Sequence, residues 1–141
     1  MTIYAESSAV LAWLLSEPDG ARVREALIRA DIVAASDLTL LEVERVLVRA
    51  VTLDEMTEAA ATDRRAVLTA AAVRWHQLRL TAEIFDRARR PFPAEPIRSL
   101  DALHLASALA ARSTLPGLEL LSLDQRIRRS GALLGFRLQP A

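Results

Sequence analysis

Short apolar segments alternate with longer amphipathic segments along the whole chain, and this alternation is the feature that most constrains the fold. The short segments have the length and apolar character of buried strands, whereas the longer ones repeat their apolar residues at helical spacing. The predicted strands are residues 2–5, 31–36, 75–80, 118–123 and 136–140, and the predicted helices are residues 7–16, 21–30, 37–50, 54–72, 81–90, 97–112 and 124–135.

The ends of these segments carry the residues that start and stop helices. Ser7 or Ser8 is placed to cap the first helix, and Ser99 is a candidate cap for the helix over residues 97–112, which has the strongest pattern. Three prolines close together force a loop before that helix: Pro91, Pro93 and Pro96. Strands that alternate with helices in this way predict an α/β protein with a central, mostly parallel β-sheet.

The length of the chain favours a single domain over residues 1–141, because 141 residues bury one sizeable core and no internal repeat or linker interrupts them. The chain has no Cys, which excludes disulfides and thiolate metal sites and fits a reducing compartment. No signal peptide and no apolar stretch of membrane-spanning length is recognisable, so a cytoplasmic protein is expected.

The net charge is zero, with 18 basic and 18 acidic residues, so any nucleic-acid binding depends on a local patch. All the basic residues are Arg. The guanidinium group suits phosphate, although a GC-rich genome is the favoured cause of this bias.

Four acidic residues stand at positions that a core does not readily explain. Glu6 and Asp124 each follow a predicted strand, Asp101 lies in the first turn of a helix, and Glu42 lies in a helix that is apolar on nearly every side. Ligands of open parallel sheets bind beyond the carboxyl ends of the strands, where separate segments meet. The four carboxylates therefore could converge at one place.

Each of these residues also has a purely structural interpretation. Asp124 could cap the helix that follows it, and Asp101 could be an acidic residue at the positive end of a helix. Glu42 could pair with Arg45 three residues along. Glu6 is harder to explain, because Glu is a poor cap and two serines stand beside it; a salt bridge to a distant Arg is the remaining structural role.

Four converging carboxylates would require a counter-ion, because mutual repulsion and burial would otherwise destabilise the fold. Mg²⁺ or Mn²⁺ suits oxygen ligands, whereas zinc is a weak candidate with only His76 and His104 available. Such a site can activate water and stabilise charge on a phosphoryl oxygen. The favoured reaction class is phosphodiester hydrolysis.

The same four positions carry a resemblance that spans the chain. The stretch Glu6-Ser7-Ser8-Ala9 after a short strand, "SDLTLLEVERVL" around Glu42, "RSLDALHLASAL" around Asp101 and "LLSLDQRI" around Asp124 occur in order, and Gly135 fits a closing "LG". The sequence resembles the PIN-domain family, and within it the VapC-like ribonuclease toxins of type II toxin–antitoxin systems. The motif around Asp101 is the most specific of the four.

The resemblance implies a PIN-like three-layer sandwich that cleaves RNA with Mg²⁺ or Mn²⁺ held by Glu6, Glu42, Asp101 and Asp124. It also implies a cognate VapB-like antitoxin whose tail occupies the active-site groove, and a homodimer. The chain departs from the family at Glu6, where the usual residue is Asp. The additional methylene moves the carboxylate by about 1.5 Å.

Further residues have two interpretations each. Ser8 either orients a water at the metal or caps a helix. Arg98, Arg126, Arg128 and Arg129 either contact RNA phosphates or form a solvated surface. His104 is interpreted as a core or interface histidine in preference to a ligand, and Trp13 and Trp75 as core residues, with an antitoxin or dimer surface as the alternative for Trp13.

Two other functions compete with the ribonuclease hypothesis. A PIN-fold module could bind RNA or a partner with weak or no nuclease activity, because Glu6 replaces the first motif Asp. A receiver-type phosphotransfer domain also clusters carboxylates at strand ends, but it usually needs a Lys that this chain lacks.

Overall fold

The computed structural model describes all 141 residues, and five short strands alternate with seven helices. The strands are β1 (Thr2–Ala5), β2 (Ile32–Ser36), β3 (His76–Leu78), β4 (Glu119–Leu121) and β5 (Leu138–Gln139). The helices are α1 (Ser7–Leu14), α2 (Gly20–Arg29), α3 (Asp37–Thr52), α4 (Glu58–Ala72), α5 (Ala82–Ala88), α6 (Ser99–Thr114) and α7 (Gln125–Leu133). Every predicted element is present, several of them shorter than expected.

The strands form one sheet in the order β3-β2-β1-β4-β5, and all four pairings are parallel. The predicted mostly parallel sheet is confirmed and is in fact entirely parallel. β1 lies in the middle, where Tyr4 is in register with Ala34 of β2 on one side and with Leu120 of β4 on the other. The first strand of the chain is therefore buried between strands that follow much later.

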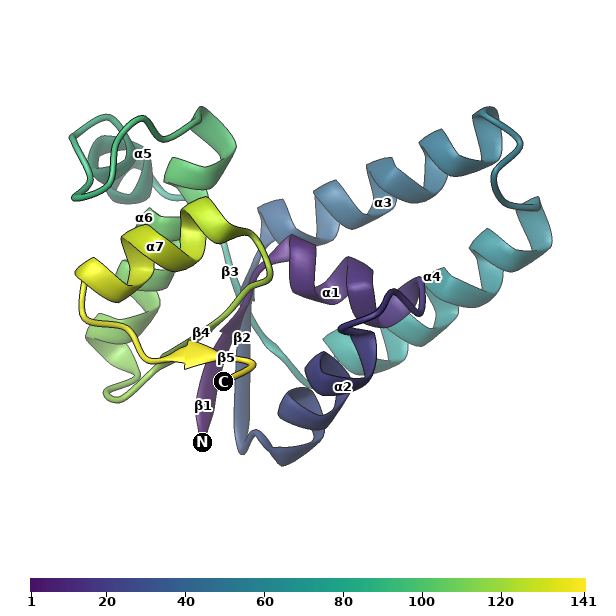
Figure 1. Ribbon diagram of the computed structural model, residues 1–141, viewed down its shortest axis with the longest axis horizontal. Helices are drawn as coiled ribbons and strands as arrows, with labels where there is room; N and C mark the ends of the chain where they lie inside the picture. Colours follow the sequence, from purple (N-terminus) through teal and green to yellow (C-terminus); the bar gives the residue numbers. More distant parts are fainter.

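Successive residues of the three central strands, β2, β1 and β4, contribute to two hydrophobic cores, one on each face of the sheet. Ile3 and Leu121 belong to the core shared with α1, α2, α3 and α4. Tyr4 and Leu120 belong to the core shared with α6 and α7. This alternation is what a strand period of two produces when both faces are covered. The result is the predicted three-layer arrangement of helices, sheet and helices, which is visible in Figure 1.

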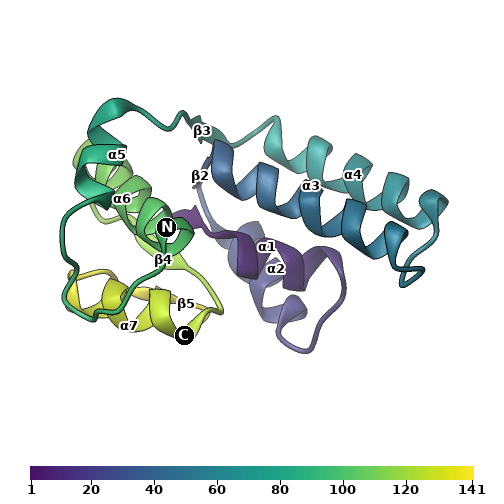
Figure 2. The ribbon, with the colours of Figure 1, turned by 90° about the horizontal axis from the view of Figure 1, so that it is seen from above.

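Helices α3 and α4 lie side by side and extend away from the sheet, as both ribbon views show (Figures 1 and 2). Closer to the sheet, α2 packs tightly against α1 at Gly20. A Cβ atom at this position would lie 2.3 Å from the carbonyl oxygen of Ala12, so only glycine fits without a backbone shift. None of the helices combines the length and the apolar character needed to cross a lipid bilayer.

Two of the expected helix caps are wrong. Glu6, and neither Ser7 nor Ser8, is the N-cap of α1, and its side chain accepts a hydrogen bond from the backbone N–H of Ser8. Helix α6 begins at Ser99, after Arg98 at the cap position, with no side-chain cap bond. Propensity alone favours a serine at both cap positions, whereas the path of the chain from strand or loop into helix sets the position.

Candidate active site

The sheet order reverses between β1 and β4, and the acidic residues gather beyond the carboxyl ends of these two strands. Glu6 directly follows β1, and its backbone N–H donates to the carbonyl of Leu121 at the end of β4 (3.0 Å). Ser122 follows β4, and Asp124 lies two residues farther along. In open α/β sheets this crevice is where ligands bind.

The Glu6 carboxylate is 3% exposed and lies within a set of hydroxyl groups. One oxygen accepts from Ser7 Oγ (2.8 Å) and from the backbone N–H of Ser8 (3.1 Å). The other accepts from Ser122 Oγ (2.7 Å) and from Ser8 Oγ. No arginine pairs with this carboxylate, so the salt bridge considered above does not form. Four donors compensate the burial of its charge instead.

Ser8 connects the ends of the two central strands. Its Oγ accepts from the backbone N–H groups of Leu123 (2.9 Å) and Asp124 (3.1 Å) while it donates to Glu6. Asp124 itself caps α7, because its Oδ1 accepts from the backbone N–H groups of Arg126 (2.9 Å) and Ile127 (3.1 Å). The capping role considered for Asp124 is therefore present. Its Oδ2 makes no hydrogen bond and stays open to a ligand.

Glu42 reaches the same place from α3 and bonds to His104 of α6. The distance from Glu42 Oε1 to His104 Nε2 is 2.5 Å, and Ser7 Oγ donates to the same oxygen (2.9 Å). Burial acts to raise the pKa of Glu42, but the hydrogen bond and charge of His104 and the Ser7 bond together lower it below its ordinary value. The ion pair with Arg45 that the sequence allowed is absent from the structure.

Asp101 lies in the first turn of α6 and makes no hydrogen bond or ion pair. Its pKa is raised by partial burial first, and then by the negative charges of Asp124 and Glu6, with a smaller contribution from Glu42. His104 acts in the opposite direction. The four acidic residues thus share one electrostatic environment, and no Arg neutralises any of them.

This donor set fits a hard divalent cation. Asp101 is repelled by Asp124 and Glu6, and each of Asp101, Asp124 and Glu42 has a carboxylate oxygen without a hydrogen-bond partner. Ligand atoms of Glu6, Glu42 and His104 lie within 4.8 Å of one another. Carboxylate oxygens are the ligands that Mg²⁺ and Mn²⁺ prefer.

The sequence interpretation missed three contributors. Ser7 and Ser122 hold Glu6, and His104 holds Glu42. Ser122 stands inside the quoted motif two residues before Asp124, which is the one sequence signal for its place. The contact of His104 with Glu42 joins residues 62 positions apart, so no local pattern reveals it.

The four arginines singled out in the sequence separate into two groups. Arg98, Arg126 and Arg129 line a pocket of about 340 Å³ between the loop before α6 and the start of α7, and none of their guanidinium groups makes an ion pair or hydrogen bond. Arg128 instead donates to the carbonyls of Ser122 (2.8 Å), Gln139 (3.1 Å) and Pro140 (3.1 Å). The side chain of Arg128 is thus engaged within the chain.

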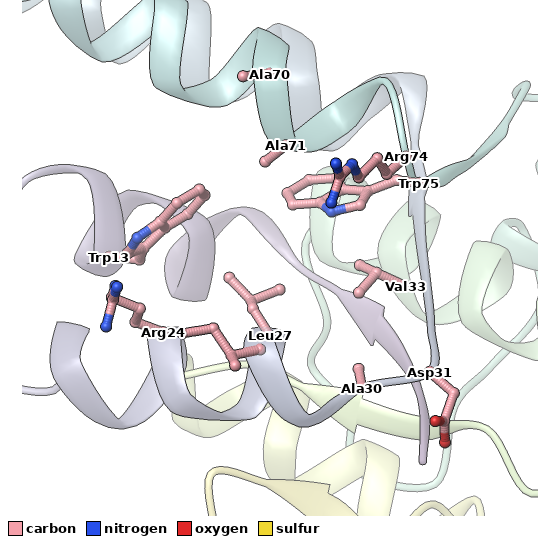
Figure 3. Close-up of a pocket in the computed structure, with 11 residues that line it drawn as sticks. Trp13, Arg24, Leu27, Ala30, Asp31, Val33, Ala70, Ala71, Arg74 and Trp75 are labelled. Atoms are coloured by element: carbon pink, nitrogen blue, oxygen red, sulfur yellow. The ribbon is translucent and has the colours of Figure 1, made fainter.

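A second concave surface lies away from the acidic residues, at the other end of the sheet. This groove of about 750 Å³ is lined mainly by apolar residues of α1, α2 and α4, with the indole rings of Trp13 and Trp75 on two of its sides (Figure 3). Arg24 and Arg74 add positive charge. Both tryptophans are only partly buried, so this surface is not part of a closed core.

A parallel α/β sheet with an acidic cluster at its switch point defines the class of this protein. A sequence model of the PIN domain matches residues 3–133, and the chain belongs to the PIN domain family. The predicted family is confirmed.

Individual relatives agree with this assignment. The chain is similar to Ribonuclease VapC45 and Ribonuclease VapC49 of two Mycobacterium tuberculosis strains, with 28% identity to each over 139 residues, 99% of this chain and 95% of each relative.

Two solved structures share the fold. VapBC2 from Rickettsia felis, bound to a DNA fragment from its promoter, superimposes with a TM-score of 0.65 at 14% identity, covering 99% of this chain and 98% of the other. Mycobacterium tuberculosis VapC20, a sarcin–ricin loop cleaving toxin, gives 0.65 at 15% identity and covers 96% of both chains.

Proposed function

We propose that the protein is a metal-dependent endoribonuclease and the toxin of a toxin–antitoxin pair. The observation that carries this proposal is the convergence of four acidic residues from four separate segments without a pairing arginine. Partial burial, and then the charges of Asp124 and Glu6, raise the pKa of Asp101 there. The curated relatives named as ribonucleases support the same reaction class.

Glu6, Glu42, Asp101 and Asp124 are the residues that would hold Mg²⁺ or Mn²⁺. A bound cation of this kind supplies charge neutralisation at the scissile phosphate and lowers the pKa of a water that can attack it. Glu6 is fixed by its four donors and Asp124 by its bonds to the start of α7, so both carboxylates are held in place before any ligand binds. Ser8 bonds to both Glu6 and the backbone of Asp124 and so positions these two residues relative to each other, and its proposed contact with a water at the metal stays a prediction.

Arg98, Arg126 and Arg129 are the proposed contacts to the RNA backbone. Their guanidinium groups have no partner within the protein, and the pocket they line lies beside the first turns of the helices that carry Asp101 and follow Asp124. Phosphate contacts of this type position the RNA without reading its bases.

The proposed partners are a cognate VapB-like antitoxin and a second copy of the chain in a homodimer. The groove with Trp13 and Trp75 supports the antitoxin, because an amphipathic segment with apolar and acidic residues would complement its apolar walls and the charges of Arg24 and Arg74. Co-expression with the adjacent small open reading frame should relieve toxicity and give a stable complex. Persistent toxicity without complex formation would favour a free-standing nuclease.

A second function is favoured by the surroundings of Glu6. Both of its oxygens already accept hydrogen bonds from serine residues. The resemblance to the PIN-domain family implies Asp at this position in place of Glu. A PIN-fold module that binds RNA or a partner with little or no cleavage is consistent with that arrangement.

One experiment separates these functions. The purified chain, free of antitoxin, is incubated with structured RNAs in Mg²⁺, in Mn²⁺ and in EDTA, beside the Asp101→Asn variant. We expect cleavage with either metal, none in EDTA and none by the variant. RNA binding without cleavage under all conditions would support the binding module, and cleavage that persists in Asp101→Asn would contradict the proposed site.

A further inference from the structure

His104 is buried directly beneath the acidic cluster and uses both of its ring nitrogens. The residue is 1% exposed and lies on α6 one turn after Asp101. Nε2 lies 2.5 Å from Glu42 Oε1, and Nδ1 lies 3.0 Å from the hydroxyl of Tyr4. The rings of His104 and Tyr4 meet edge to face, with centroids 6.2 Å apart. Packing and hydrogen bonds therefore hold the imidazole in one orientation.

The partners determine which nitrogen carries a proton. Oε1 of Glu42 accepts from Ser7 Oγ (2.9 Å) and also lies 2.5 Å from Nε2, and a carboxylate oxygen can only accept. His104 Nε2 must then be an N–H donor. On the other side of the ring, the Tyr4 hydroxyl donates to Ser36 Oγ (3.0 Å) and lies 3.0 Å from Nδ1, which continues the chain of bonds into β2.

Glu42 has fewer hydrogen-bond donors than Glu6, so the bond from His104 Nε2 matters more to Glu42 than any single bond matters to Glu6. Only Ser7 Oγ and His104 Nε2 bond to Glu42, and both bond to Oε1. The single hydroxyl proton of Ser7 is shared between Glu42 (2.9 Å) and Glu6 (2.8 Å). His104 Nε2 also lies 3.3 Å from Ser7 Oγ and 3.8 Å from Glu6 Oε1, but its shortest contact by far is with Glu42 (2.5 Å), so His104 is the main donor to Glu42. Oε2 of Glu42 is left without a hydrogen bond.

We infer that His104 is a positioning residue: its Nε2–H holds Oε1 of Glu42 and leaves Oε2 free for a cation, and Tyr4 holds His104 in turn. This inference rests on the proposed metal-dependent function. Outer partners of this kind orient ligating carboxylates, and their loss typically weakens metal binding 10–100-fold. The neighbouring possibility, that His104 is itself a ligand, would require its Nε2 to leave Glu42.

Two amide variants provide a matched test. In His104→Gln the amide nitrogen takes the place of Nε2 and can still donate to Glu42, whereas in His104→Asn it takes the place of Nδ1 and cannot reach Glu42. The dissociation constant of Mn²⁺ is measured by electron paramagnetic resonance of the free ion, with circular dichroism in EDTA as the control for folding. We expect His104→Gln to stay within about threefold of wild type and His104→Asn to bind roughly 10–100-fold more weakly.

Equal Mn²⁺ affinity of the two variants would overturn the inference. Coupling of a nitrogen nucleus to bound Mn²⁺ in the wild-type spectrum would overturn it as well, because it would show that His104 is itself a ligand. Should His104→Asn fail to fold, Tyr4→Phe decides: it keeps the ring and removes the bond to Nδ1, and an unchanged Mn²⁺ affinity would contradict the positioning role. Failure of the proposed function looks different, since wild type itself would then neither bind Mn²⁺ nor cleave RNA.

Discussion

Arg128 and Arg129 are neighbours of the same type in the sequence, yet the structure predicts opposite consequences for their replacement. Arg128 donates to three backbone carbonyls that join the end of β4 to the end of the chain, at 2.8, 3.1 and 3.1 Å. Arg129 is exposed, bonds to nothing in the protein and lines the pocket with Arg98 and Arg126. The matched variants Arg128→Met and Arg129→Met keep most of the aliphatic stem and remove the charge.

The expected cost follows from the bonds lost. A hydrogen bond that involves a charged group contributes about 1.5–3 kcal/mol. Three bonds from one half-buried guanidinium do not add fully, so Arg128→Met should lower the free energy of unfolding by about 2–4 kcal/mol. For a chain of this size that corresponds to a fall in Tm of roughly 6–16 °C. Arg129→Met should change the free energy of unfolding by less than about 0.5 kcal/mol.

The assay combines thermal unfolding by circular dichroism with RNA binding by Asp101→Asn protein carrying each change. Arg129→Met should weaken RNA binding and reduce its salt dependence by about one unit of slope, because one phosphate contact is lost. Equal Tm values for the two variants would refute the structural role of Arg128. Arg128→Met protein that keeps its Tm but loses RNA binding would reverse the two assignments.

Two further predictions concern stability. Asp101 has a raised pKa in the fold, so its charge destabilises the metal-free protein at any pH above the ordinary pKa of Asp. Asp101→Asn should therefore be more stable than wild type in EDTA at pH 7, and this difference should disappear below about pH 3.9. Urea unfolding across this pH range measures the difference, and a variant that is no more stable at pH 7 would contradict the prediction. Gly20→Ala should lower the free energy of unfolding by about 1–3 kcal/mol, because the added Cβ would lie 2.3 Å from the Ala12 carbonyl oxygen. An unchanged urea midpoint would show that α2 can shift away from α1 without a loss of stability.

The fold was predictable because its signals are local. Apolar runs of strand length and helical periodicity lie in the sequence itself, and their alternation leaves few arrangements other than a parallel sheet covered on both faces. The exact element ends were not predictable, since Glu6 caps α1 through a bend after β1 that no propensity describes.

The four acidic positions were accessible from the sequence because each follows a strand or interrupts an apolar pattern. The groups that support them were not accessible, since a hydroxyl or imidazole such as Ser122 or His104 looks like any buried polar residue until its partner is known. The same limit applies to Arg128 and Arg129. They lie on different sides of α7, and only the side of Arg128 faces the last residues of the chain.

The strand order also has a consequence for the making of the protein. β1 emerges from the ribosome first but pairs on one side with β4, and the last acidic residue of the cluster, Asp124, follows β4 near the end of the chain. A nascent chain therefore carries an unpaired edge on its central strand, and an incomplete cluster, until β4 and Asp124 have also been synthesised. The four carboxylates can meet only after that point of translation.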